Sequence, residues 1–190
     1  MQNHFYAMMS RMKNIYRWGL MRNTKSENLS EHSLEVAQIA HALALIGKTR
    51  FGKNIDPNFI CVSAMYHDTS EIITGDMPTP IKYYNDEIKS AYKQIEKKAE
   101  KELIDMLPED FKDEFKSIYY PDSETKKYVK AADKISALIK CRQELDMGNK
   151  EFLVAERTVR QAAESIDMPE VKVFLEEFLP SFSLSLDEQK

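Results

Sequence analysis

Apolar residues recur along most of this chain every three or four positions, the spacing of an amphipathic helix. This pattern predicts helices over residues 4–16, 31–46, 57–71, 85–107, 109–118, 123–147, 150–166 and 169–179. The final segment, PSFSLSLDEQK at 180–190, alternates apolar and polar residues instead, and we expect it to pack as an extended strap. Because the sequence shows no internal repeat or linker, we predict one all-α domain that covers residues 1–190.

Capping and helix-breaking residues predict where some of these helices begin and end. Ser30 is suited to cap the second helix, and Asp56 followed by Pro57 is suited to open the third. The segment GDMPTP, at 75–80, contains two prolines, so we expect a rigid turn there rather than a continuing helix.

The longest predicted amphipathic stretch, 85–107, has one apolar face, formed by Ile88, Tyr92, Ile95, Ala99 and Leu103. Lysine and glutamate alternate around this face in KSAYKQIEKKAEK, at 89–101. Mixed charges around an apolar stripe indicate a solvated helix surface rather than a basic binding patch.

The composition supports a globular protein and excludes several functional classes. With 190 residues, of which 43% are hydrophobic and 31% charged, the chain can bury a sizeable core. Its five glycines include neither a dinucleotide-binding fingerprint nor a P-loop. A formal net charge of −4 disfavours binding to a nucleic-acid polymer, which requires many cations to neutralise phosphates. A small anionic substrate, held by one or two local cations, remains open.

Cysteine usage and the N-terminal sequence both favour a cytoplasmic protein. Cys61 and Cys141 lie in separate helical patterns without a C-x-x-C pair, as expected for buried thiols in a reducing compartment. The N-terminus contains no unbroken apolar core of a signal peptide. The longest apolar stretch, 39–46, is interrupted by His41 and is too short to span a bilayer, so we expect no membrane partner.

The segment YHDTSEIITGD, at 66–76, places an imidazole and three carboxylates where an apolar helix is expected to end. His67 and Glu71 are four residues apart, and Asp68 and Glu71 are three apart, spacings that put side chains on one helical face. Imidazole and carboxylate are common ligands of divalent metal ions. Two adjacent ligands do not complete a site, so further donors must come from elsewhere in the chain.

Three other histidines are available as ligands. His32 stands in the first turn of its predicted helix, and His41 follows nine residues later, about half a turn around that helix. The two therefore cannot serve one site, and His32, near the helix end, is the better candidate. His41 lies in IAHALAL and is expected at the edge of the core, whereas His4 lies near the terminus.

A carboxylate later in the chain could complete the metal site. Asp133 lies in VKAADKISALI, at the edge of an apolar stripe, and a buried carboxylate is costly unless it is paired or bound to metal. It also lies between Lys130 and Lys134, as a solvated surface aspartate would. Spacing alone leaves both interpretations open, and residue patterns lead only to a helical protein with a candidate metal cluster.

His32, the pair His67-Asp68 and Asp133 resemble the H…HD…D signature of the HD-domain phosphohydrolases. Longer segments are similar to the bacterial HD-domain 5′-deoxynucleotidases: RWGLMRN at 17–23, SENLSEHS at 26–33, YHDTSEIITGDMPTPIKY at 66–83 and PSFSLSLDE at 180–188. The likeness extends along essentially the whole chain. It implies an all-α, single-domain HD-domain helical bundle that removes the 5′-phosphate from deoxyribonucleoside monophosphates, with little base preference, as a homodimer.

The resemblance also implies a ligand set and a metal. His32, His67, Asp68 and Asp133 would bind one divalent ion, typically cobalt, with manganese or copper as substitutes. HD proteins with two metals use extra histidines after the HD pair, and this chain has none beyond His67, so a single-metal site follows.

Roles for the remaining motif residues follow from the same resemblance. Glu71 would orient or deprotonate the attacking water, Asp68 could assist proton transfer, and Arg17 would bind the phosphate through its forked guanidinium. Trp18 would wall the sugar site and leave no room for a 2′-hydroxyl. The full expected substrate-binding set is Arg17, Trp18, His32, Asp68, Asp76, Met77, Pro78, Thr79 and Asp133, in which Asp76 would accept a hydrogen bond from the 3′-hydroxyl.

Two alternatives remain at this point. The chain could be another single-metal HD phosphohydrolase that acts on ribonucleotides or triphosphates, although no cluster of cations accompanies the motifs in the sequence. It could also be a non-catalytic helical module that senses nucleotides. The presence of Glu71 together with all four metal-ligand candidates favours an enzyme.

Overall fold

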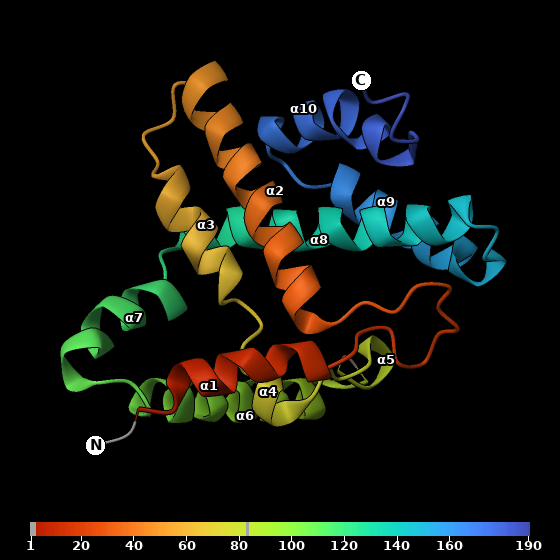
Figure 1. Cartoon of the computed structure of the whole chain (residues 1–190). Helices are drawn as coiled ribbons and strands as arrows, with labels where there is room; N and C mark the ends of the chain where they lie inside the picture. The colour runs from red at the N-terminus through yellow and green to blue at the C-terminus, as the bar shows by residue number, and fades with distance from the viewer. Residues whose placement is uncertain (1–2, 83) are drawn as a thin grey trace.

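Helices form nearly all the regular structure of the chain in this computed structural model, which describes residues 3–82 and 84–190 (Figure 1). The elements are α1 (Phe5–Met9), η1 (Ser10–Asn14), α2 (Leu29–Arg50), α3 (Pro57–Met65), α4 (Glu71–Thr74), α5 (Thr79–Lys82), α6 (Asp86–Asp105), η2 (Glu109–Phe111), α7 (Lys112–Tyr119), α8 (Ser123–Asp146), η3 (Lys150–Phe152), α9 (Leu153–Glu164), α10 (Pro169–Glu177) and η4 (Leu179–Ser183). Within the described ranges, strand pairing is limited to one isolated antiparallel bridge between Tyr16 and Asn28. The predicted all-α fold is confirmed.

Helix α2 begins two residues earlier than predicted. Asn28, rather than Ser30, is the cap: its side chain accepts hydrogen bonds from the backbone N–H groups of Ser30 and Glu31. Glu31 in turn accepts a hydrogen bond from the Asn28 N–H, which completes a capping box. This cap places His32 in the first turn of the helix.

Helix α3 opens at Pro57 with Asp56 as its cap, as predicted, but it ends at Met65 instead of residue 71. Residues 66–70 continue as tight turns, in which the N–H groups of Thr69 and Glu71 donate to carbonyls three residues earlier. Side chains compete for the carbonyls at this helix end, because Thr69 Oγ1 donates to the Tyr66 carbonyl at 2.9 Å. His67 and Asp68 therefore lie in this turn rather than in α3.

Three smaller expectations also require correction. Thr79–Lys82 form one helical turn, whose first two residues belong to the stretch at 75–80 that was expected to be a rigid turn. Ile95, expected on the apolar face of α6, is 53% exposed. The tail is not an extended strap, because Leu179–Ser183 form a 3₁₀ helix, with Leu179 buried. Tyr83, the last residue of the motif at 66–83, lies outside the described residues.

Helices α2 and α8 cross at the centre of the molecule, and α3, α9 and α10 pack around the crossing (Figure 1). Fully buried side chains from both central helices fill the contact, among them Val36, Leu43, Ile135, Leu138 and Ile139. Burial of each such aliphatic side chain stabilises the fold by about 1.5–3 kcal/mol. The crossing therefore fixes the relative positions of α2 and α8.

A second, smaller apolar cluster joins α1, α6 and α7 below the end of α3. Phe5, Leu103, Leu107 and Phe115 form its buried centre, and the ring of Tyr66 packs against Phe5 and Phe115. Tyr66 directly precedes the His-Asp pair, so the packing of its ring against this cluster helps to hold the turn in place.

The expected character of the cysteines and of His41 is largely confirmed. Cys141 is buried, Cys61 is half-buried, and both thiols are free. His41 is half-buried at the edge of the core. No helix among the described residues is long and apolar enough to cross a membrane.

Gly47 marks a close approach of α2 to a buried hydrogen-bonded carboxylate. Glu170 accepts hydrogen bonds from the Tyr128 hydroxyl and the Lys53 ammonium, both at 2.6 Å. A Cβ atom at Gly47 would lie 2.7 Å from both Glu170 Oε1 and the Tyr128 hydroxyl oxygen, so only glycine fits.

We expect Gly47→Ala to lower the free energy of unfolding by about 1–2 kcal/mol, because the clash with a buried network outweighs the better helix propensity of alanine. Urea unfolding followed by circular dichroism measures the change. Gly19→Ala is the matched control, since a Cβ atom there meets nothing within 4 Å. Equal stability of the two variants would contradict this packing.

Candidate metal centre

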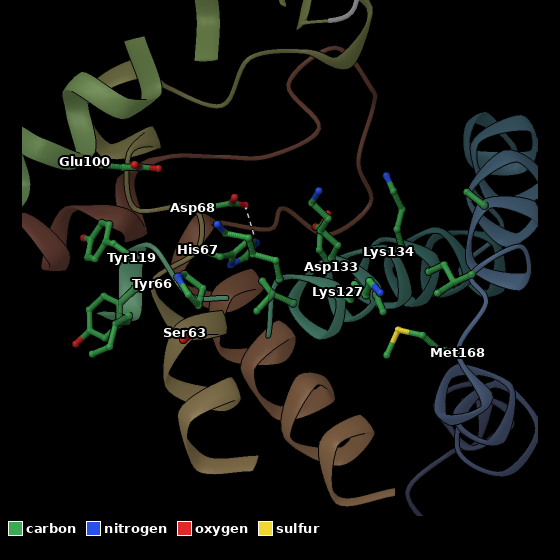
Figure 2. Close-up of a pocket in the computed structure, with 18 of the residues that line it drawn as sticks. Ser63, Tyr66, His67, Asp68, Glu100, Tyr119, Lys127, Asp133, Lys134 and Met168 are labelled. Carbon is green, nitrogen blue, oxygen red and sulfur yellow. Dashed lines mark ion pairs between the residues drawn. The ribbon is translucent and has the colours of Figure 1, made fainter. Parts of the chain in front are cut away.

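Three separate elements bring the four predicted metal ligands together. His32 comes from the first turn of α2, His67 and Asp68 from the turn after α3, and Asp133 from the middle of α8. Asp68 Oδ2 lies 3.0 Å from His67 Nε2 and 3.6 Å from His32 Nε2. Asp133 Oδ1 lies 3.3 Å from His32 Nε2. Figure 2 shows His67 beside Asp68, with Asp133 approaching from α8.

The donor set fits a divalent metal ion. One ligand atom each from His32, His67 and Asp68 can be chosen so that all lie within 4.8 Å of one another. Asp133 approaches this group through its contact with His32. The Nε2 atoms of both histidines are buried and have no hydrogen-bond partner among the described residues. Such nitrogen atoms are costly to bury unless something binds them, and a metal ion would do so.

Hydrogen bonds on the opposite side of each ring orient the two imidazoles. His67 Nδ1 lies 2.7 Å from the Ala64 carbonyl oxygen, which accepts a hydrogen bond from it. His32 Nδ1 lies 3.2 Å from Ser136 Oγ, and the Ser136 hydroxyl donates to Glu35 at 2.6 Å. With Nδ1 as the donor in each ring, both Nε2 atoms face the cluster, which is the usual arrangement behind metal-binding histidines.

Opposite charges shift the protonation of the cluster. Burial alone would lower the pKa of His67, but the carboxylates of Asp68 and Asp133 raise it to about 9. Burial would raise the pKa of Asp68, yet His67 and His32 hold it well below its usual value. The pKa of Asp133 is lowered despite its burial, mainly by its close contact with the His32 imidazole. The carboxylates are thus ionised, as metal ligands must be.

Glu71 lies near the predicted metal ligands, and its carboxyl group has an unusual pKa. Its side chain is buried, and Oε2 has no hydrogen-bond partner among the described residues. Burial, followed by repulsion from Asp68 and Asp76, raises the pKa of Glu71 to about 8. A carboxyl group that titrates near neutral pH can both take and give a proton, which suits general acid–base chemistry.

Arg17 and Trp18 lie on the loop that leads into α2. Arg17 Nη1 approaches Asp68 Oδ2 at 3.5 Å, so this predicted phosphate ligand lies beside the metal residues. Glu27 Oε2 accepts hydrogen bonds from the Trp18 indole at 2.8 Å and from Arg17 Nε at 3.3 Å. The loop is also held at Glu144, which accepts hydrogen bonds from the N–H groups of Thr24 and Lys25.

The segment 76–79 is less closely tied to the cluster. Asp76 is half-buried, and burial raises its pKa while the charge of Arg17 opposes this shift. Met77 and Pro78 are half-buried, and Thr79 is exposed at the start of α5. His4, at the edge of α1, is exposed and belongs to no metal-ligand cluster found among the described residues.

A cavity of about 990 Å³ opens beside the cluster between α3, α7 and α8. His67, Asp68 and Asp133 line it, and Tyr66 and Tyr119 lie at one end (Figure 2). Residues 76–79 do not line this cavity. Four exposed lysines of α8 do line it, Lys126, Lys127, Lys130 and Lys134, so the fold creates a group of cations that the sequence analysis did not expect.

Several supporting residues were missed in the sequence analysis, although two carried a signal. Glu35 follows His32 by three residues, and Ser136 follows Asp133 by three, spacings that place each pair on one helical face. The contacts of Glu27 and Glu144 with the loop before α2 carried no such signal, because the loop residues that they bond lie ten and about 120 residues away.

We expect Ser136→Ala to weaken metal binding about tenfold or more, because His32 loses the hydrogen bond that orients its ring. Competition with a chromophoric chelator measures the affinity. The matched control is Ser165→Ala, whose hydroxyl bonds only to the Ala162 carbonyl at the surface. Wild-type affinity in the Ser136 variant would show that the hydrogen bond has no role in metal binding.

Comparisons with known proteins agree with this geometry. A family model described as 5′-deoxynucleotidase YfbR-like matches residues 4–182. The chain is 50% identical to a 5′-deoxynucleotidase of Vibrio atlanticus (strain LGP32), covering 98% of each chain. It is also 50% identical to the 5′-deoxynucleotidase YfbR of Escherichia coli (strain ATCC 8739), covering 98% of this chain and 96% of that protein.

Solved structures share the same architecture. An HD-domain phosphohydrolase from Listeria innocua superposes with a TM-score of 0.82 at 25% identity, covering 100% of this chain and 93% of that chain. The HD phosphohydrolase DatZ of cyanophage S-2L, bound to dA and one catalytic Zn²⁺ ion, superposes with a TM-score of 0.64 at 20% identity, covering 95% of this chain and 99% of that one. The HD-domain fold is therefore confirmed, and the chain belongs to the YfbR-like 5′-deoxynucleotidase family.

Proposed function

We propose that this chain is a metal-dependent 5′-deoxynucleotidase that hydrolyses deoxyribonucleoside 5′-monophosphates to deoxynucleosides and phosphate. Family membership and the identity of 50% to two relatives with this name support the reaction. The observation that carries the proposal is the convergence of His32, His67, Asp68 and Asp133, with two buried Nε2 atoms that face these carboxylates and have no hydrogen-bond partner within the described structure.

One divalent metal ion would be held by His32, His67, Asp68 and Asp133. When bound, such an ion lowers the pKa of a coordinated water and withdraws charge from a phosphoryl oxygen. We propose cobalt as the ion that activates the enzyme in vitro, with manganese or copper as substitutes. The catalytic Zn²⁺ ion described for DatZ supports a single-metal site in this fold.

Arg17 is the proposed phosphate ligand. Its guanidinium lies 3.5 Å from Asp68, and it can donate two parallel hydrogen bonds to a phosphate group. Asp68 would serve as ligand and as a partner in proton transfer. The lysines Lys127, Lys130 and Lys134 around the cavity add positive potential that favours an anionic substrate.

Glu71 is the proposed general base. Its carboxyl is buried near Asp68, but the ligand atoms that gather within 4.8 Å of one another in the described structure come from His32, His67 and Asp68 rather than from Glu71. In its ionised form it can accept a proton from the attacking water. Once protonated, it can return that proton, and the deoxynucleoside alkoxide that leaves requires one.

The sugar would be selected by the loop before α2 and by the segment 76–79. In this proposal the ring of Trp18 fills the space that a 2′-hydroxyl needs, and Asp76 accepts a hydrogen bond from the 3′-hydroxyl. Met77, Pro78 and Thr79, which lie outside the cavity beside the cluster, would contact the sugar of the bound nucleotide. Selection by steric exclusion explains how ribose is rejected without a hydrogen bond to the missing group.

Exposed apolar residues and the cysteines bear on the oligomeric state and the cellular location of the protein. We propose a homodimer, which the exposed apolar residues Leu153 and Val154 at the start of α9 support, with exposures of 52% and 71%. We propose a cytoplasmic location, since two free, largely buried thiols suit a reducing compartment. The net charge of −4 favours a small anionic substrate over a nucleic-acid polymer.

We expect phosphate release from dAMP in the presence of cobalt, with much slower release from AMP, dATP and 3′-dAMP. A phosphate assay across these four nucleotides measures the rates. Equal turnover of AMP and dAMP would contradict deoxyribose specificity, and preference for dATP would instead assign the cavity lysines to a triphosphate. No release from any nucleotide by the metal-loaded protein would favour a sensing module.

We expect Glu71→Gln to lower kcat for dAMP by about 10²–10⁴-fold, because the amide cannot accept the proton. Metal content, measured by elemental analysis, should stay at the wild-type level. Glu100→Gln is the matched control, since Glu100 lines the cavity beside the cluster but belongs to no proposed ligand or catalytic set. A Glu71 variant with wild-type kcat would remove this residue from the mechanism.

A further inference from the structure

We propose that Glu27 is a positioning residue that fixes Arg17 and Trp18 as one unit and thereby sets the preference for deoxyribonucleotides. The inference rests on the proposed function, in which Arg17 binds the phosphate and Trp18 excludes the 2′-hydroxyl. Neither the motif pattern nor the ligand set assigns a role to Glu27.

One carboxylate oxygen of Glu27 joins the two recognition side chains. Glu27 Oε2 accepts the Trp18 indole N–H at 2.8 Å and the Arg17 Nε–H at 3.3 Å. The side chains of both Arg17 and Glu27 are only 13% exposed, so solvent screens this contact weakly. Because the bond to Arg17 uses Nε, the terminal nitrogen atoms of the guanidinium remain available for a phosphate.

The backbone of Glu27 is itself fixed to the metal-binding helix. The Arg17 N–H donates to the Glu27 carbonyl at 3.0 Å, and the Leu29 N–H donates to the Ile15 carbonyl at 2.8 Å. These bonds pair 15–17 with 27–29, directly before α2 begins. Glu27 is therefore held directly before the helix that carries His32. Through Glu27, the side chains of Arg17 and Trp18 are positioned relative to the metal centre.

Trp18 is held in a backbone conformation that a bulky residue rarely adopts. Its φ of 59° lies in the left-handed region, which is disfavoured by contacts of the Cβ atom. Strained residues persist only where the surroundings hold them, and they often mark functional sites. Besides Glu27, the ring of Phe152 packs on the indole, with centroids 5.4 Å apart, and Asn23 donates a hydrogen bond to the Trp18 carbonyl at 3.2 Å.

These contacts predict what happens when the Glu27 side chain is truncated to alanine. Without an acceptor for the indole N–H, the ring can turn on Phe152 and open the space that excludes a 2′-hydroxyl. At the same time Arg17 loses its anchor and is drawn toward Asp68, which lowers its affinity for phosphate. Both effects come from one side chain, so discrimination and phosphate binding should change together.

The experiment compares Glu27→Ala and Glu27→Gln with the wild type in the metal-loaded, full-length enzyme. Steady-state kinetics give kcat/KM for dAMP and AMP. Trp18 is the only tryptophan of the chain, so intrinsic fluorescence reports directly on its surroundings. Glu177→Gln is the matched control, because Glu177 also pairs with an arginine, Arg50, but does so at the exposed surface.

In Glu27→Ala we expect the ratio of kcat/KM for dAMP over AMP to fall about tenfold or more, with red-shifted Trp18 emission. In Glu27→Gln the amide oxygen can still accept the indole N–H, so the ratio and the emission should stay near the wild-type values. Because this variant removes the charge beside Arg17, KM should rise for both nucleotides. Glu177→Gln should match the wild type throughout.

A wild-type ratio and emission in Glu27→Ala would overturn the inference. If that variant does not fold, Trp18→Phe replaces it: this change keeps an aromatic ring but removes the N–H group, and an unchanged ratio would overturn the inference equally. Failure of the proposed function is distinguishable, since it would appear as a wild-type enzyme that does not prefer dAMP. The Glu27 variants are interpreted only against a wild-type preference.

Discussion

The structure depends on one geometric constraint, the crossing of α2 and α8 at the end of α3. That crossing places His32 and Asp133 beside the His67-Asp68 pair, although these residues are separated by up to about a hundred positions in the sequence. Apolar packing between the two long helices fixes the crossing, so the free energy of the core also maintains the metal centre. A shift of either helix by one turn would separate the ligands by about 5 Å.

Around this centre, buried polar groups are arranged for binding rather than for stability. The two Nε2 atoms and Glu71 Oε2 are buried without partners among the described residues, which disfavours the folded state until a ligand arrives. Other contacts orient these residues from outside: Ser136 and the Ala64 carbonyl bond the imidazoles on their opposite side, and Glu27 bonds Arg17 and Trp18. Binding groups that are left unsatisfied but are oriented by surrounding hydrogen bonds are typical of catalytic sites.

Local features of the fold and site were predictable from sequence, and features that depend on distant contacts were not. Periodicity located the long helices, and the position of His32 near a helix start distinguished it from His41. Asp133 stayed ambiguous because only the crossing of α2 and α8 brings it to His32. The early end of α3 was missed because side-chain hydrogen bonds in the turn override the helical pattern. Resemblance to a family supplied the function, since spacing alone could not.

The central claim is that one divalent ion lies between α2, α8 and the turn after α3. Anomalous diffraction from crystals of the cobalt-loaded protein, collected at the cobalt absorption edge, tests it most directly. The account predicts one strong anomalous peak per chain, within bonding distance of the Nε2 atoms of His32 and His67 and of carboxylate oxygens from Asp68 and Asp133. A peak elsewhere, or imidazoles that face away from the ion, would contradict it.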